Sequence, residues 1–330
     1  MREGTKMKTQ TFNMKKNNLP ILTVISFLLI VLILVLILIN LSNQGKEKKD
    51  FTNNNVIRAQ KQMEKGDAIV ANIWITKESL SKIKENKIKY LIIDIGDTSK
   101  SGKIETPKNE INDFLSLITD YEKENNYNFI ILSYSEINTY SYDFNDKLKN
   151  NFISDYSMLI ESGFDGVYVD IEPVRFSERE EYLDFLNFLN LKIPKNKIIA
   201  VYSGTLSKGE NDNEWGWDRG YFKKVSDKVD LIFIPGYDYS ISEEDEYKEE
   251  LKYQVSELSK LNLNSNLMLG IPTHKNYPET IENSLSVYAS EVQKNNGRFV
   301  GIGIFAEWTM DENEWEVYER FKNPFLLGKL

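Results

Sequence analysis

Three carboxylates fall within eight residues of a largely apolar run, GFDGVYVDIEPV at 163–174. If this run is a β-strand, its side chains alternate, so that Tyr168, Asp170 and Glu172 share one face. Two carboxylates on one face, about 6 to 7 Å apart, raise each other's pKa in a cleft of low dielectric. Such a pair can hold Glu172 protonated near neutral pH as a proton donor, with Asp170 deeper and ionised.

A structural interpretation of the same acids stays open. Asp170 and Glu172 could pair with basic side chains or lie exposed at the end of the strand. Burying an unpaired carboxylate is costly, which favours the interpretation in which the two acids do chemistry.

The elements that would position these acids follow a regular pattern after Asp67. Eight β-branched, apolar segments predict strands, and longer amphipathic segments between them predict helices. The predicted strands are 67–75, 89–96, 128–135, 166–172, 197–204, 230–237, 266–273 and 299–308. The predicted helices include 77–87, 109–126, 179–191, 245–261 and 280–296. Eight such repeats over some 260 residues indicate a (β/α)8 TIM barrel. A doubly wound open sheet is the alternative, but no glycine-rich phosphate loop follows the first strand.

In a (β/α)8 barrel the chemistry takes place at the carboxyl ends of the strands. Polar or aromatic residues near those ends are therefore the candidates for a site. They are Trp74, Asp94, Asp97, Ser133, Ser135, Asp170, Glu172, Tyr202, Tyr237, Asp238, His274, Glu307 and Trp308.

The stretch DGVYVDIE at 165–172 resembles the DxxDxDxE signature of the family 18 glycoside hydrolases, the chitinase-like barrels. In that family the signature lies on the fourth strand, as it does here. Three later stretches are similar to the family's sixth, seventh and eighth strands: PGYDY at 235–239, LMLGIPTHK at 267–275 and GIGIFAEW at 301–308. The resemblance spans residues 67–322.

The resemblance implies hydrolysis of a glycan that contains β-linked N-acetylglucosamine, with the substrate's own acetamido group as nucleophile. Glu172 then matches the general acid, and Asp170 matches the aspartate that orients the acetamido group. Tyr237 would hydrogen-bond that group, Asp238 would support the site, and Trp308 would form an apolar floor. We expect Asp170, Glu172, Tyr237 and Trp308 to converge in one cleft.

Three further aromatic residues are candidates for contact with the glycan. Tyr202 ends the fifth predicted strand, Trp74 ends the first, and Tyr168 lies below Asp170. Trp215 and Trp217 lie in a loop after the fifth strand, where sugar stacking and ordinary packing are equally good interpretations.

Two departures from the family pattern keep other functions open. Tyr168 stands where the family has the middle aspartate of its signature, and ILSYSEIN at 131–138 lacks the glycines of the family's third strand. One alternative is a chitinase-like surface protein that binds glycan without cleaving it. Another is a polygalactosaminidase-like hydrolase, because those barrels also carry a GFDGVxxD stretch.

The first 66 residues predict a different organisation. Residues 21–39 contain no charged side chain. As a helix, this uncharged run is long enough to span the core of a bilayer. We expect a basic cytoplasmic stretch at 1–20, a transmembrane anchor at 21–41, a linker at 42–66 and the barrel domain at 67–330, outside the cell membrane. A cleaved signal peptide is the alternative, although no small-residue cleavage pattern follows the apolar run.

Charge and composition narrow the partners. Residues 51–330 carry 33 basic and 47 acidic side chains, a net charge of −14, which disfavours nucleic acid and anionic polymers. The chain has no cysteine and one histidine, so neither a thiolate nor a multi-histidine metal site is available. We expect no cofactor and no metal.

Overall fold

The computed structural model describes residue 58 and residues 63–99, 101–138, 145–209, 215–274, 276–295 and 298–322. The chain divides into two compact units, Met1–Asn54 and Asn55–Leu330, and all of the described residues belong to the second. The predicted basic stretch and anchor, 1–20 and 21–41, lie outside the described residues. Among the residues that are described, no helix combines the length and the apolar composition that a membrane crossing requires.

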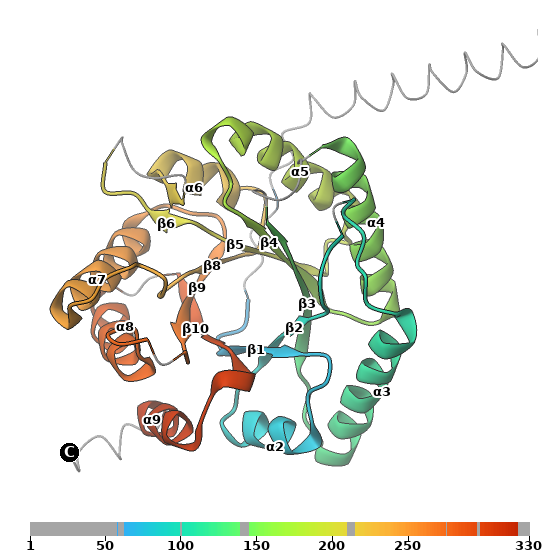
Figure 1. Ribbon diagram of the computed structural model, residues 1–330, viewed down its shortest axis with the longest axis horizontal. Helices are drawn as coiled ribbons and strands as arrows, with labels where there is room; N and C mark the ends of the chain where they lie inside the picture. Colours follow the sequence, from blue (N-terminus) through green and yellow to red (C-terminus); the bar gives the residue numbers. More distant parts are fainter. Residues whose placement is uncertain are drawn as a thin grey trace, which may run out of the picture. The chain divides into compact units, whose positions relative to one another are not determined.

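Eight parallel strands close into a barrel in the order β1-β10-β9-β8-β5-β4-β3-β2, which confirms the predicted TIM barrel (Figure 1). The strands are β1 Ala68–Asn72, β2 Tyr90–Asp94, β3 Ile130–Asn138, β4 Gly166–Glu172, β5 Ile198–Tyr202, β8 Leu231–Ile234, β9 Asn266–Pro272 and β10 Phe299–Phe305. Each of the eight predicted strand segments contains or overlaps one of these, so the βα pattern of the sequence is sufficient to give the architecture.

Helices surround the barrel, as Figure 1 shows. They are α2 Lys77–Glu85, α3 Lys108–Asn125, α4 Asp146–Ser162, α5 Arg179–Lys192, α6 Arg219–Ser226, α7 Glu244–Lys260, α8 Ile281–Asn295 and α9 Glu312–Lys322. Thr76, Asn145 and Asp218 precede α2, α4 and α6, and each side chain accepts a hydrogen bond from the backbone N–H three residues later. These polar caps satisfy donors that the first turn of a helix leaves without a partner.

Strand alternation divides the apolar residues into two cores. On β4, Val167, Val169 and Ile171 belong to the core between the strands and the helices. Tyr168, two positions below Asp170, belongs to the smaller core inside the barrel. The predicted parity of the fourth strand is therefore confirmed, and Asp170 and Glu172 continue the inward face.

The packed unit extends further toward the N-terminus than the predicted boundary at residue 67. Arg58 is buried, and its Nε donates to Asp230 Oδ2 at 2.8 Å while Nη1 donates to Asn190 Oδ1 at 3.0 Å. Asp230 also accepts a hydrogen bond from the backbone N–H of Ile199. Part of the segment predicted as a linker thus contributes a buried ion pair beside the starts of β5 and β8.

A short two-stranded sheet follows β5 and lies near the carboxyl end of β4. It pairs β6, Thr205–Leu206, with β7, Gly216–Trp217. Gly204 permits this pairing because a Cβ there would lie 2.0 Å from the carbonyl oxygen of Trp215. Trp217 is buried in the core between the strands and the helices. Of the two interpretations of this residue, packing is therefore correct and sugar stacking is not.

Candidate active site

The central acids lie at the carboxyl end of β4. Glu172 is the last residue of the strand, and a cis proline, Pro173, follows it. Asp170 is one pleat deeper and only 5 % exposed. Its Oδ1 is buried and has no hydrogen-bond partner among the described residues. A buried acceptor without a partner is rare in proteins and calls for an explanation.

Both acids line a cavity of about 90 Å³ at this end of the barrel. The residues that line it are Val70, Tyr134, Glu136, Tyr168, Asp170, Glu172, Tyr202, Tyr237, Asp238 and Phe305. Six of the eight residues predicted from the sequence to form the site are among them. Trp74 and Trp308 are not.

The environment of the cavity favours the neutral forms of its acids. Burial raises the pKa of Glu172 to about 7, and the nearby carboxylates of Glu136 and Asp238 add to the effect. Burial also raises the pKa of Asp170 well above its usual range, and Glu172 and Glu136 raise it further. A contact with the Tyr134 hydroxyl opposes this shift without cancelling it.

This result supports one expectation and corrects another. Glu172 carries a proton over part of the neutral range, as a proton donor must. Asp170, expected to be ionised, is instead held toward its neutral form. The reason is that Asp170 is buried beside the carboxylates of Glu172 and Glu136, and no described cation forms an ion pair with it.

Glu136 is the residue of this site that the sequence prediction missed. The strand β3 continues to Asn138, three residues beyond its predicted end, and its register sets Glu136 directly opposite Asp170. Ser133 and Ser135, which were predicted instead, have the opposite parity. Their hydroxyls donate to the backbone carbonyls of Gly166 and Gly96 outside the cavity. The signal was available, because Ile137 continues the apolar alternation past Ser135.

Tyr168 forms part of the cavity's inner wall. It is 3 % exposed, and its ring meets those of Tyr134 and Phe233 edge to face at centroid distances of 5.3 and 5.6 Å. The position that the resemblance assigns to an aspartate is thus filled by a large aromatic ring inside the barrel. Tyr202 stacks on Phe233 at a centroid distance of 6.4 Å and also lines the cavity.

The apolar side of the cavity is formed by Phe305 rather than by Trp308. β10 ends at Phe305, whose ring stacks on Tyr237 at 5.4 Å with an interplanar angle of 21°. Trp308 lies in a short 3-10 turn beyond the strand, is 46 % exposed and touches Phe305 edge-on. The predicted floor position of Trp308 is therefore wrong for this structure, since the strand ends three residues earlier.

Trp74 is also placed away from the cavity. β1 ends at Asn72, and Trp74 follows in a turn where it is 71 % exposed. Its backbone N–H donates to the Asn72 side chain. Val70 is the residue of β1 that lines the cavity.

Asp238 is held at the rim by a buried glutamate. Both carboxylate oxygens of Glu279 accept backbone hydrogen bonds, one from Asp238 N and one from Tyr239 N, at 2.7 and 2.8 Å. Burial raises the pKa of Asp238, and His274 opposes that shift. Ligand atoms of Asp238, His274 and Glu279 lie within 4.8 Å of one another. Because Glu279 already accepts bonds with both oxygens, we assign this cluster to holding the loop rather than to binding a metal.

Other candidates lie around this site. Asp94 and Asp97, at the end of β2 and just beyond it, act electrostatically on Glu136. Trp215, 41 % exposed, lines a narrow space on the other side of Glu172 together with Pro173 and Gly204. Glu307 lies in the turn beside Trp308, outside the lining.

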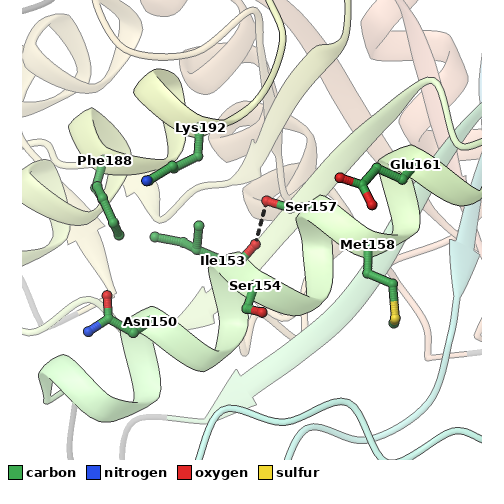
Figure 2. Close-up of a pocket in the computed structure, with 8 residues that line it drawn as sticks. All are labelled: Asn150, Ile153, Ser154, Ser157, Met158, Glu161, Phe188 and Lys192. Atoms are coloured by element: carbon green, nitrogen blue, oxygen red, sulfur yellow. Dashed lines mark hydrogen bonds between the residues drawn. The ribbon is translucent and has the colours of Figure 1, made fainter.

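A larger concavity of about 500 Å³ lies between α4 and α5, on the helical layer (Figure 2). It is lined by Asn150, Ile153, Ser154, Ser157, Met158, Glu161, Phe188 and Lys192. The Ser157 hydroxyl there donates to the Ile153 carbonyl, an ordinary bond within a helix. None of the predicted site residues lines it, so its size does not make it the better candidate.

No protein-family model matches the sequence, and no curated protein matches it significantly. Solved structures match its fold. The Bacillus cereus spore cortex-lytic enzyme SleL has a TM-score of 0.56 and 14 % identity, over 78 % of this chain and 74 % of that one. A family 18 chitinase from Crocus vernus has a TM-score of 0.56 and 13 % identity, over 79 % of this chain and 99 % of that one. The tamarind chitinase-like lectin has a TM-score of 0.52 and 10 % identity, over 78 % and 98 %.

Each of these matches covers more than three quarters of this chain. At such low identities the likeness is one of fold, and the group includes both enzymes and a lectin. The fold that the resemblance implied is therefore confirmed: the described barrel has the fold of the chitinase-like family 18 proteins.

Proposed function

We propose that this protein is a glycoside hydrolase that cleaves a β-linked glycan containing N-acetylglucosamine, with Glu172 as the general acid. The observation that carries the proposal is the pair formed by Glu172 and Asp170. One has a pKa of about 7, and the other has a buried oxygen without a partner in the same cavity.

The proposed reaction begins with the acetamido group of the sugar in the cavity. Its N–H donates to Asp170, which supplies the missing partner of Oδ1. Its carbonyl oxygen attacks the anomeric carbon while Glu172 gives its proton to the departing glycosidic oxygen. Water then opens the cyclic intermediate with Glu172 as the base, so that the anomeric configuration is retained. This scheme uses the substrate as nucleophile and differs from the usual scheme with two catalytic carboxylates.

Three aromatic residues support this scheme in different ways. The Tyr237 hydroxyl is proposed to hydrogen-bond the acetamido carbonyl, since Tyr237 lines the cavity with Asp170. Phe305, stacked on Tyr237, offers an apolar face to the sugar ring. Tyr168 closes the inner end of the cavity and limits the depth that the acetamido group can reach.

The second candidate is a surface protein that binds the same glycan without cleaving it. The fold is compatible with this function, since a chitinase-like lectin shares it. Tyr168, in place of the middle aspartate of the signature, is the specific observation in its favour. The fate of the proton on Asp170 therefore decides between the two candidates.

An assay with defined substrates tests the proposed function. The full chain and Glu172→Gln are incubated separately with chitooligosaccharides and with purified cell wall, and reducing ends and binding are both measured. We expect release by the wild type and binding without release by the variant. Binding by both proteins with equal, negligible release would identify a glycan-binding protein instead.

We further propose that residues 21–39 anchor the protein in the cell membrane, with the barrel on the extracellular side. The uncharged run and the lysine and arginine residues before it support this arrangement. An extracellular location would bring the barrel to cell-wall or environmental glycans. Protease accessibility of the barrel in intact cells tests it, and protection from added protease would contradict it.

A further inference from the structure

Glu136 and Asp170 face each other across adjacent strands. The parallel register of β3 and β4 pairs the two residues directly, and both line the cavity. Adjacent strands lie about 4.8 Å apart, so two inward side chains at paired positions can reach each other, directly or through one water molecule. Glu136 is exposed at the mouth, whereas Asp170 is buried.

Asp170 has no second carboxylate below it on its own strand. Tyr168 fills that position and packs against Tyr134 and Phe233. Above it lies Glu172, which the proposed reaction needs as a proton donor. Of the other carboxylates that line the cavity, Glu136 is the one whose strand position is paired with that of Asp170.

The charged groups around Glu136 are acidic on both sides. Asp94 and Asp97 act on it from β2 and the loop that follows. Asp170 and Glu172 face it from β4. None of these five acids forms an ion pair with a lysine or arginine of the described residues. The one histidine, His274, lies beside Asp238 and is not among the residues that line the cavity.

We propose that Glu136 takes the proton of Asp170 when the substrate binds, and so leaves Asp170 ionised beside the substrate. The O–H bond of Asp170 breaks and an O–H bond forms on Glu136, so the negative charge moves from Glu136 to Asp170. Asp170 can then accept the acetamido N–H with a full carboxylate charge. The inference rests on the proposed function and makes Glu136 a positioning residue that acts through Asp170.

The direction of transfer follows from the surroundings of the two groups. Without substrate the proton stays on Asp170, because burial and two neighbouring carboxylates raise its pKa well above its usual range. The pKa of Glu136 is also raised, because the cavity wall removes part of its carboxyl group from water and because Asp97 and Asp94 are negatively charged. An N–H from the substrate stabilises the charged form of Asp170, and a sugar seated at the mouth removes water from Glu136 and so disfavours its charged form. Substrate binding therefore shifts the proton outward.

Carboxyl-carbon NMR tests the coupling without relying on activity. The full chain is labelled with ¹³C at aspartate and glutamate carboxyls, and Asp170→Asn identifies the Asp170 signal by its loss. Wild type, Glu136→Gln, Glu136→Asp and Asp97→Asn are titrated. Two charges about 5 Å apart, at an effective dielectric between about 80 and 20, interact by roughly 0.6 to 2.4 pH units. We expect the titration of Asp170 to move down by such an amount in Glu136→Gln and to return in Glu136→Asp.

Asp97→Asn is the matched control, because it removes a nearby exposed charge that does not line the cavity. It should move the Asp170 titration by less than half as much as Glu136→Gln does. Equal shifts in these two variants, or coincident titrations of wild type and Glu136→Gln, would overturn the assignment.

Steady-state kinetics separate this inference from the proposed function. We expect Glu136→Gln to lower kcat by about 10-fold or more with little change in KM, and Glu136→Asp to recover much of it. The alkaline limb of the pH profile should also move to lower pH, because Glu136 raises the pKa of Glu172. An unchanged kcat and pH profile in Glu136→Gln, with Glu172→Gln inactive, would overturn the role of Glu136 alone. An inactive wild type would overturn the proposed function, and the NMR titration would then decide the coupling.

Discussion

Glu172 owes its chemistry to the side chains around it. Burial is the largest cause of the raised pKa of Glu172, and the negative charges of Glu136 and Asp238 raise it further. The pKa is therefore about 7 instead of 4.5. No lysine or arginine of the described residues pairs with Glu172 to reverse this shift. Keeping Glu172 protonated at neutral pH costs folding free energy, because the same side chain is ionised in the unfolded chain at that pH.

This cost predicts a stability that depends on pH. The folded state binds the Glu172 proton more tightly than the unfolded state, so the contribution of Glu172 to stability falls as pH rises from about 4.5 to about 7. Glu172→Gln should therefore be more stable than wild type at pH 8, by about 1 to 3 kcal/mol, and nearly equal to it at pH 4. Denaturant unfolding at both pH values measures the difference.

Glu105→Gln, at an exposed loop position, serves as the control and should change stability little at either pH. A gain in Glu172→Gln that is the same at pH 4 and pH 8 would show that the effect is one of packing and not of ionisation.

The strands position the site through their alternation and their ends. Eight segments of apolar alternation predict the barrel, and the parity of β4 places Asp170 and Glu172 inside it. The errors lie at the ends. β3 runs three residues beyond its predicted end and so includes Glu136, while β10 ends at Phe305 and so leaves out Trp308. Where a strand stops depends on pairing with its neighbours, which a single sequence does not display.

Contacts between residues far apart in the sequence were also beyond prediction. Whether Asp170 is charged depends on Glu136 in the adjacent strand and on the depth of burial. The motif alone suggests an ionised Asp170, because it gives only the spacing of residues along β4. It contains no information about side chains on the neighbouring strand, such as Glu136. The helices α4, α6 and α9 were absent from the predicted segments, although the barrel pattern required helices in those places.

Glycines on β9 and β10 make room for the aromatic residues of the interior. A Cβ on Gly270 would lie 2.5 Å from Phe233 Cε1 and 2.9 Å from Tyr237 Cε1. Gly270→Ala should therefore displace both rings, lower stability by about 1 to 3 kcal/mol and lower kcat/KM through Tyr237. Unfolding and kinetics with chitooligosaccharides measure the two effects.

Gly209→Ala is the control for this substitution, because a Cβ at Gly209 would meet no atom within 4 Å. It should change stability by no more than about 0.5 kcal/mol. Equal effects of the two substitutions would contradict the packing that we describe for Phe233 and Tyr237.

The molecule as a whole combines an acidic barrel with a buried ion pair near its amino end. The net charge of −14 on residues 51–330 suits a neutral or cationic ligand better than an anionic one. The fold does not decide between enzyme and lectin, because both kinds of protein share it. What distinguishes the two functions is whether the carboxylates of the cavity can transfer protons to and from a bound glycan.

Arg58 should be essential to the stability of this unit. Arg58→Ala leaves Asp230 buried without its cation, and we expect a loss of about 3 to 5 kcal/mol in the free energy of unfolding. Lys77→Ala, which breaks the exposed pair with Glu124, should cost no more than about 1 kcal/mol. Chemical denaturation of the two variants gives the comparison. Losses of similar size would mean that residue 58 does not belong to the folded barrel.

The role of Glu172 as proton donor is tested most directly by varying the leaving group of the substrate. Wild type and Glu172→Gln are compared on an N-acetylglucosamine oligomer, whose sugar leaving group needs a proton, and on its nitrophenyl glycoside, whose leaving group does not. We predict that Glu172→Gln loses about 10²- to 10⁴-fold in kcat on the oligomer and far less on the nitrophenyl glycoside. Equal losses on both substrates, or undiminished hydrolysis of the oligomer, would contradict the account.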